Sequence, residues 1–329
     1  MIKGDGAQDA VDMLAEARSA QMLSEAESPG WIELVAPAKV NLVLNVGDRL
    51  DSGYHRVSTI LHALNLHDTV FMRRTAAPEG SGLSVAAEVK GRGGVSVPEI
   101  ASADNLAAKA VALLARAIGR AEDERVEIRI DKRIPAQAGL GGGSSDAAAA
   151  LVGACRLWGV DPSAREVRDA ACEVGSDVAF FLQGGCAAFA GKGDEFVRSL
   201  CASKRPVVLV KPERGVSTVR AYQAFDADPV PADGAVEAAF DEVGSADDVP
   251  LFNNLALASE GLEPELSAVR YWLEGRCGAG RALLCGSGSC TFALCESFDE
   301  AVAVSVEARK RGWWSRATSL GPLKAAVVR

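Results

Sequence analysis

A glycine-rich segment that ends in two serines and an aspartate is the first feature of the sequence that suggests chemistry. It reads Gly139-Leu140-Gly141-Gly142-Gly143-Ser144-Ser145-Asp146, and a helix-forming run, Ala147 to Trp158, follows at once. Glycines at the start of a helix let backbone N–H groups approach a ligand closely, and the helix dipole there favours negative charge. Phosphate is therefore the expected ligand, although glycine-rich segments also form plain turns.

The spacing of this segment distinguishes it from two common nucleotide loops. No lysine follows the glycines, as it would in the Gly-x-x-x-x-Gly-Lys-Ser/Thr loop, and the glycines are spaced differently from those of the dinucleotide-binding fingerprint. The segment therefore predicts a third class of nucleotide-binding loop.

Two charged residues in apolar surroundings are candidates for catalysis. Asp177 precedes the apolar run Val178 to Phe181, and Lys39 lies in the mostly apolar segment Ala36 to Leu42. Such charges are costly unless they are paired or functional. Phosphoryl transfer to an alcohol needs a carboxylate at the acceptor hydroxyl and cations at the phosphoryl oxygens. Asp177 is equally consistent with a helix N-cap and Lys39 with a solvated edge lysine, so both gain weight only if the fold brings them together.

The apolar pattern predicts an α+β arrangement around these groups. Strands are expected at Trp31 to Val35 and Val40 to Val46, separated by Ala36-Pro37-Ala38. A helix capped by Asp104 is expected to reach Ile118, and a strand at Val126 to Ile130 leads toward the glycine segment. Further elements are expected at Val57 to Leu66, Thr69 to Arg73, Ser84 to Val89, Arg165 to Gly175, Ala187 to Ala190, Val207 to Val210, Ala235 to Val243, Ala282 to Cys285, Thr291 to Cys295 and Phe298 to Arg311.

Composition bounds the class of protein. The chain has 329 residues, 48% of them hydrophobic, which is enough for two domains that share a cleft. With a net charge of -9, the protein as a whole would repel nucleic acid and anionic membranes. An anionic ligand must therefore bind at a local site with its own favourable contacts. With no apolar stretch near the roughly 20 residues of a membrane span and no signal peptide, we expect a cytoplasmic protein with reduced cysteines.

Four motifs taken together resemble a known family. They are Pro37-Ala38-Lys39-Val40-Asn41-Leu42, Gly53-Tyr54-His55, the segment Gly139 to Asp146, and Gly286-Ser287-Gly288. The last two are shared across the GHMP kinase superfamily. The first two are much more specific and resemble the 4-diphosphocytidyl-2-C-methyl-D-erythritol kinases. The resemblance runs from Trp31 to about Leu323.

The resemblance implies a two-domain α+β GHMP kinase fold with the active site between the domains. Residues 31–190 would form a nucleotide- and substrate-binding domain similar to ribosomal protein S5 domain 2. Residues 191–329 would form a ferredoxin-like domain. Residues 1–30 would be an extension, either disordered or a short helix.

The resemblance also implies catalytic and nucleotide-binding roles. Asp177 would remove or orient the proton of a methylerythritol hydroxyl, and Lys39 would support that ionisation and the transferring phosphoryl group. ATP with Mg would be the phosphate donor. The residues expected to bind ATP are Pro135, Ala138, Gly139, Leu140, Gly141, Gly142, Gly143, Ser144, Ser145 and Asp146. Ser145 and Asp146 lie near the expected phosphates, but the metal ligands stay open.

The acceptor site implied by the resemblance spans two ends of a substrate. Tyr54 and His55 would recognise cytidine by stacking and hydrogen bonding, and Tyr222 would cover the other face of the base unless it is a half-buried core tyrosine. Asn41 would help hold the acceptor. The turn expected to contact the acceptor is Gly286, Ser287 and Gly288.

The implied reaction is phosphorylation of the 2-hydroxyl of 4-diphosphocytidyl-2-C-methyl-D-erythritol, a step of the non-mevalonate isoprenoid route, by a monomer or homodimer. Two alternatives remain: a sister GHMP kinase acting on homoserine or mevalonate, and a non-catalytic nucleotide-binding homologue. Gln137, Asn254 and Ser289 depart from the residues usual in the family. These departures leave the affinity for nucleotide and the geometry of the turn after Gly286 open.

Overall fold

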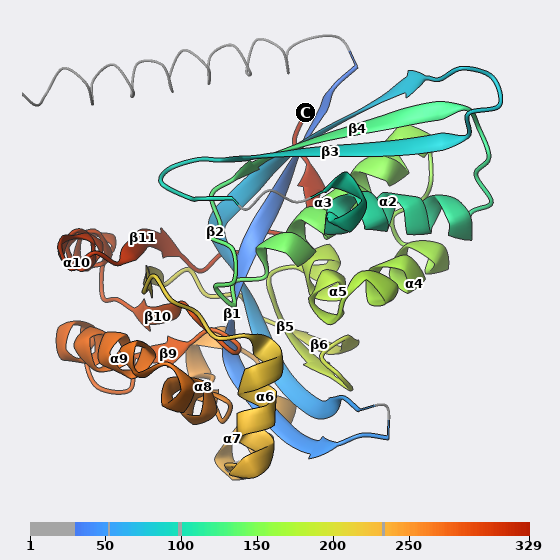
Figure 1. Ribbon diagram of the computed structural model, residues 1–329. Helices are drawn as coiled ribbons and strands as arrows, with labels where there is room; N and C mark the ends of the chain where they lie inside the picture. Colours follow the sequence, from blue (N-terminus) through green and yellow to red (C-terminus); the bar gives the residue numbers. More distant parts are fainter. Residues whose placement is uncertain (1–29, 52, 98–100, 232–233) are drawn as a thin grey trace, which may run out of the picture.

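The computed structural model describes the chain except residues 1–29, 52, 98–100 and 232–233 (Figure 1). The expected N-terminal extension therefore lies outside the described residues, apart from Gly30. In the described part, strands form two sheets, one of eight strands and one of four, and helices pack on both. The α+β architecture expected from the sequence is confirmed.

The larger sheet is built around two long strands. Its path is β12-β1-β2-β4-β3, with β5 joined to β2, β6 to β5 and β8 to β1. The pairs β3–β4 and β1–β8 are parallel and the others are antiparallel. The strands are β1 (Ile32–Arg49), β2 (His55–Ala76), β3 (Leu83–Gly91), β4 (Glu124–Lys132), β5 (Cys186–Ala190), β6 (Glu195–Leu200), β8 (Phe252–Asn253) and β12 (Ala326–Val327).

Strand β1 corrects one expectation from the sequence. The segment Ala36-Pro37-Ala38 does not separate two strands, because β1 runs through it without a break. Proline lacks the N–H that a strand interior needs, and it is tolerated where the pairing is irregular. The register of β1 with β2 shifts between Pro37 and Lys39, so a bulge accommodates the proline and re-aims the side chain of Lys39.

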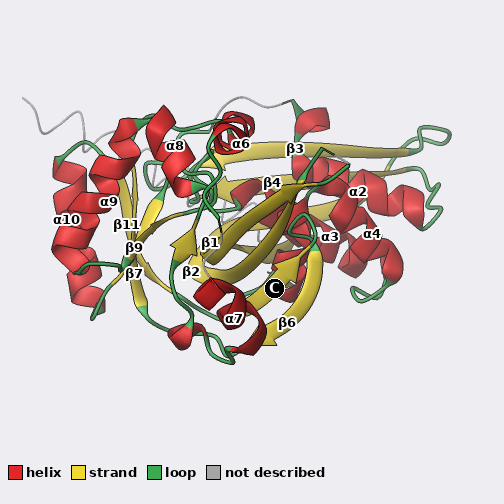
Figure 2. Cartoon of the chain, turned by 90° about the horizontal axis from the view of Figure 1, so that it is seen from below, coloured by secondary structure: helices red, strands yellow, loops and turns green. Residues whose placement is uncertain are grey.

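The smaller sheet has the order β11-β7-β10-β9, with all pairs antiparallel. Residues Val207 and Leu209 of β7 face the core between the two sheets, whereas Val208 and Val210 pack under helices on the outer face. Those helices are α9 and α10 (Figure 2). The elements are β7 (Pro206–Lys211), β9 (Ala282–Leu284), β10 (Thr291–Leu294), β11 (Trp314–Ser319), α9 (Pro264–Cys277) and α10 (Phe298–Lys310).

Four helices cover the larger sheet at the opposite end of the molecule (Figures 1 and 2). They are α2 (Leu106–Ala117), α3 (Gly142–Trp158), α4 (Arg165–Val174) and α5 (Ser176–Gln183). Helix α3 begins at Gly142, within the glycine segment rather than after it. The cap of α2 is also corrected: Asp104 ends the 3-10 turn Ser102–Asp104, and Asn105 is the N-cap, since its side chain accepts a hydrogen bond from Ala107 N.

Shorter elements follow strand β7 along the chain. They are α6 (Thr218–Ala227), α7 (Gly234–Glu242), the 3-10 turn Ala246–Asp248 and α8 (Ala256–Leu262). Strands β6, β8 and β12 lie after residue 190 in the sequence and still join the larger sheet. A division of the chain at residue 190 therefore stays a proposal.

Candidate active site

The fold brings Lys39 and Asp177 together. The Nζ atom of Lys39 lies 3.5 Å from Oδ2 of Asp177, and the two side chains are 5% and 34% exposed. Lys39 also donates to Oδ1 of Asn41 at 2.8 Å, and Nδ2 of Asn41 donates to Oγ1 of Thr59 at 2.9 Å. Asn41 on β1 and Asp177 on α5 therefore hold the buried ammonium of Lys39, and Thr59 on β2 holds Asn41 in turn. The fold thus brings the two candidate catalytic residues together, as their proposed roles require.

The structure excludes both plain explanations of these two residues. Lys39 is not a solvated edge lysine, because its side chain is buried. Asp177 is not the N-cap of α5, since Gly175 occupies that position and Asp177 lies in the first turn. The dipole of α5 favours a negative charge there. The carboxylate thus faces a lysine and a helix N-terminus while staying open to a ligand.

A cavity of about 210 Å³ surrounds this ion pair. Segments far apart in the chain meet on its walls: Asn41 from β1, Gly139 and Gly141 from the glycine segment, and Gly286 and Ser287 from the turn between β9 and β10. Gly288, the third residue of that turn, does not line this cavity. The carboxylate of Asp177, the ammonium of Lys39 and the backbone of the glycine segment therefore line the same cavity.

The glycine segment lines a second, larger cavity of about 540 Å³. The predicted ATP-binding residues on its wall are Pro135, Ala138, Gly139, Leu140, Gly141, Gly142, Gly143, Ser144 and Asp146. Ser145 does not line it and is fully buried in α3. Gly139 and Gly141 line both cavities, so a phosphate chain bound along this segment can reach the Lys39–Asp177 pair.

Backbone contacts fix the glycine segment against the rest of the cleft. Lys39 N donates to Leu140 O at 3.0 Å, and Cys290 N donates to Ala138 O at 3.1 Å. A Cβ atom at Gly139 would lie 1.9 Å from the carbonyl oxygen of Cys285. Only glycine permits this approach, which joins the segment to both sheets.

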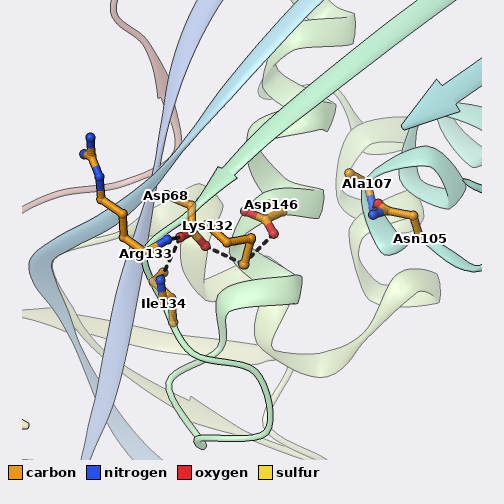
Figure 3. Close-up of polar contacts among 7 residues, drawn as sticks. All are labelled: Asp68, Asn105, Ala107, Lys132, Arg133, Ile134 and Asp146. Atoms are coloured by element: carbon orange, nitrogen blue, oxygen red, sulfur yellow. Dashed lines mark hydrogen bonds and ion pairs between the residues drawn. The ribbon is translucent and has the colours of Figure 1, made fainter. Parts of the chain in front are cut away.

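A buried cluster under the glycine segment was not expected from the sequence (Figure 3). The ammonium of Lys132 bonds to the carboxylates of Asp68 and Asp146, the latter at 2.7 Å. Burial raises the pKa of Asp146 to about 7, against the attraction of the Lys132 charge. Burial alone would lower the pKa of Lys132, but the charges of Asp146 and Asp68 outweigh it and raise that pKa. The cluster supports the first turn of α3.

The three predicted cytidine-binding residues lie in different environments. Tyr54 is 61% exposed, so its ring is available for stacking. His55 is buried, with Nε2 2.6 Å from Oδ1 of Asp226 and its ring centroid 5.1 Å from that of Tyr222. Burial, helped by the nearby charge of Asp177, raises the pKa of Tyr222 to about 12, so its phenol stays protonated. Tyr222 packs against a core cluster and also lines the smaller cavity.

The turn after β9 is held by two residues that the sequence analysis did not assign. Asn253 donates from Nδ2 to Leu284 O at 2.9 Å and to Gly286 O at 2.8 Å. Thr218 places Oγ1 3.0 Å from Oγ of Ser287, and it lines both cavities. These contacts join residues distant in sequence, so no local pattern could have indicated them.

The three departures from the family pattern have structural roles. Gln137 has a φ of 51°, and its carbonyl accepts a hydrogen bond from the Ser289 hydroxyl at 3.1 Å. Asn254 accepts from Val46 N and donates to Val46 O and Val230 O, each at 2.9 Å. Ser289 therefore links the turn to the nucleotide loop, and Asn254 ties β1 to the segment after α6.

Two features are absent from the described residues. No group of three or more His, Cys, Asp or Glu side chains there is arranged to hold a metal ion. No helix within the same residues is long and apolar enough to cross a membrane.

Comparison with known proteins gives the family. The model of the GHMP kinases N terminal domain matches residues 105–185, and that of the GHMP kinases C terminal domain matches residues 235–312. A 4-diphosphocytidyl-2-C-methyl-D-erythritol kinase of Nocardia farcinica is 38% identical over 93% of this chain and 98% of that protein. The enzyme of the same name from Mycobacterium tuberculosis is 37% identical over 84% of this chain and 86% of that protein.

Solved structures agree with these sequence relatives. A crystal structure of 4-(cytidine 5'-diphospho)-2C-methyl-D-erythritol kinase matches with a TM-score of 0.71 at 32% identity, covering 88% of this chain and 99% of that one. Homoserine kinase from Cytophaga hutchinsonii matches with a TM-score of 0.67 at 18% identity, covering 92% and 98%, which shows a common fold. The chain therefore belongs to the 4-diphosphocytidyl-2-C-methyl-D-erythritol kinase family of the GHMP kinases.

Proposed function

We propose that this chain transfers the γ-phosphoryl group of ATP to the 2-hydroxyl of 4-diphosphocytidyl-2-C-methyl-D-erythritol. In the reaction a bond forms between the acceptor oxygen and the γ-phosphorus, the bond from that phosphorus to the bridging oxygen of ADP breaks, and the hydroxyl proton leaves. The observation that carries the proposal is the Lys39–Asp177 pair at 3.5 Å, in a cavity that shares two glycines with the nucleotide loop.

Asp177 is the proposed proton acceptor. Its carboxylate is partly exposed on the cavity wall, whereas the ammonium of Lys39 is buried behind it and bonded to Asn41. A cation fixed beside the carboxylate stabilises negative charge that develops on the acceptor oxygen and on the transferring phosphoryl group. Because Asn41 and Thr59 hold Lys39, this stabilisation needs little rearrangement during the reaction.

The nucleotide loop fits the phosphates of ATP. Helix α3 starts at Gly142, and the cavity beside its first turn is lined by the glycine segment. Free N–H groups at a helix N-terminus, together with the helix dipole, favour bound phosphate. Thr218 borders this cavity and the smaller one, so the γ-phosphoryl group would lie where the two meet.

The residues near the first turn of α3 also fit a magnesium ion. Oδ1 of Asp146 and Oγ of Ser145 are buried and form no hydrogen bond within the described chain. Carboxylate and hydroxyl oxygens are ligands that Mg²⁺ accepts, and a cation there would offset the cost of a buried carboxylate. We propose Asp146, with Ser145, as the protein's contribution to such a site. When bound, the ion would neutralise charge on the ATP phosphates.

Three further expectations remain proposals based on the sequence. They are a cytoplasmic location, the absence of nucleic-acid partners and a monomeric or homodimeric state. The free state of all eight cysteines supports the first, and the net charge of -9 supports the second.

The test of the proposed function is ADP release from ATP and Mg by the purified protein with four acceptors. These are 4-diphosphocytidyl-2-C-methylerythritol, free methylerythritol, homoserine and mevalonate. We expect turnover with the cytidine compound alone. Turnover with homoserine or mevalonate would instead identify a sister kinase, and no turnover with any acceptor would indicate a nucleotide-binding homologue without catalysis.

A further inference from the structure

A lysine outside the recognised motifs reaches the acceptor side of the cleft. Lys192 lies in the turn between β5 and β6, and its side chain is 39% exposed. It lines the 210 Å³ cavity together with Asp177. Its Nζ atom also lies 5.7 Å from the centre of the Tyr54 ring. One flexible cation therefore borders both the catalytic carboxylate and the aromatic ring proposed to stack on the base.

The turn that carries Lys192 is fixed to the sheet. Gly193 N donates to Ala190 O at 2.9 Å and closes the turn, and Val57 N donates to Gly191 O at 2.8 Å. Val57 lies two residues after His55 in the chain, where β2 pairs with Val46 of β1. The backbone of Lys192 is thus held at a set place beside the acceptor residues, while its side chain stays free to adjust.

Lys192 differs from Lys39, the other lysine of this cavity, in its burial and in its charged partners. Lys39 is almost fully buried and already contacts Asp177 and Asn41. Lys192 has one acidic contact, Oδ2 of Asp194 at 3.3 Å. A ligand with two phosphate groups carries at least two negative charges, so it can compete with a single carboxylate for this ammonium.

We propose that Lys192 binds the diphosphate that joins the cytidine and methylerythritol parts of the acceptor. The inference rests on the proposed function and deepens it. If the base stacks on Tyr54 and the reacting hydroxyl lies at Asp177, the linking diphosphate must lie between them, which is where Lys192 reaches. Asp194 holds the lysine beside the cavity until the diphosphate displaces it.

The test compares ligands that differ only in phosphate. Binding of cytidine, CMP and CDP is measured by titration calorimetry for the wild type, Lys192→Met and Lys192→Arg, with Lys310→Met on α10 as a control for the loss of one exposed lysine. We expect Lys192→Met to weaken CDP binding about tenfold and cytidine binding less than twofold, consistent with loss of one charge-assisted contact. Lys192→Arg should keep most of the affinity for CDP, and Lys310→Met should match the wild type.

A second variant tests the competition with Asp194. Asp194→Asn removes the carboxylate that holds Lys192, so we expect CDP to bind as tightly as in the wild type or a few-fold more tightly. In steady state, Lys192→Met should raise the KM for the cytidine acceptor more than it lowers kcat, with little change in the KM for ATP. The effect of Lys192→Met on CDP should shrink as salt concentration rises.

Three results would overturn the inference in distinguishable ways. Unchanged CDP binding in Lys192→Met excludes a role for the lysine. Equal losses for cytidine and CDP show that Lys192 supports Tyr54 rather than the diphosphate. Failure of the wild type to bind either ligand, with ATP still bound, removes the proposed acceptor and the inference with it.

Discussion

Substitution of one loop glycine should destabilise the protein while a neighbouring substitution does not. Gly141 is the N-cap of α3 and has a φ of 72°, in the left-handed region. A Cβ atom there would lie 2.6 Å from Cζ of Phe181 and 3.1 Å from Cγ of Lys39. Phe181 is fully buried in the main core cluster, so its ring has little space into which it can move.

The expected cost of Gly141→Ala has two parts. The left-handed conformation costs a residue with a Cβ about 1 kcal/mol. Forcing a methyl group into a packed core costs about 1–3 kcal/mol more. The free energy of unfolding should therefore fall by about 2–4 kcal/mol. A shift of Lys39 should also lower kcat, because a displacement of about 1 Å at a reacting group can cost about 100-fold.

Gly143→Ala is the matched control. Gly143 lies in the first turn of α3 with no positive φ, and a Cβ atom there would meet only Cδ1 of Leu106, at 3.4 Å. Alanine in a helix is favoured over glycine by up to about 1 kcal/mol. The same chemical change two residues away should therefore be neutral or slightly stabilising.

Thermal unfolding of the ligand-free variants measures this difference. We expect the Tm of Gly141→Ala to fall by roughly 3–6 °C and that of Gly143→Ala to stay within about 2 °C of the wild type. The chain has 329 residues and more than one core cluster, so the comparison uses Tm values rather than a two-state fit. Equal Tm values for the two variants would refute the packing argument at Gly141.

Three other expectations concern charged residues of the cleft. Asp177→Ala should lower turnover by about 100-fold with little change in ATP affinity, and unchanged turnover would remove Asp177 from its role as base. Asp226→Ala should raise the KM for the cytidine acceptor several-fold, because His55 loses the partner that orients it. The KM for ATP should not change, and parallel rises in both KM values would contradict this role. Since the pKa of Asp146 is raised in the fold to about 7, its contribution to stability is present at low pH and is lost as pH rises through 7. The Tm of the wild type relative to that of Asp146→Asn should therefore fall as the pH rises from 5 to 8, and a pH-independent difference would count against the raised pKa.

Local sequence signals predicted those elements whose formation depends on neighbouring residues. The glycine segment at a helix start, the strand before it and the apolar run of β7 are of this kind. The sequence predictions were wrong where contacts between distant segments decide the local structure. Pro37 usually breaks a strand, but a bulge in the pairing with β2 accommodates it. Asp104 and Asn105 are equally good caps by type, and the 3-10 turn before α2 selects Asn105.

The active-site pair shows the same limit. Lys39 and Asp177 could be named from the cost of a charge in an apolar segment, but their 3.5 Å contact depends on the fold bringing Lys39 of β1 beside Asp177 of α5. The cluster of Asp68, Lys132 and Asp146 could not be predicted, because Asp146 was expected only near the phosphates and nothing in the segments of Asp68 and Lys132 indicates that they meet it. Such networks become visible only when strands and helices distant in sequence are packed together.

Helix α6 gives the cleft a fixed length that suits a two-ended acceptor. Thr218, Tyr222 and Asp226 are spaced four residues apart and therefore lie along one face of the helix. Thr218 contacts Ser287 where the two cavities meet, Tyr222 lines the smaller cavity, and Asp226 holds His55. At 1.5 Å per residue, the face spans about 12 Å. A rigid helix thus sets the distance between the proposed phosphoryl-transfer end and the proposed base-binding end. An acceptor that lacks a base at that distance would leave half of this face unused, which is why the proposed function requires the cytidine group.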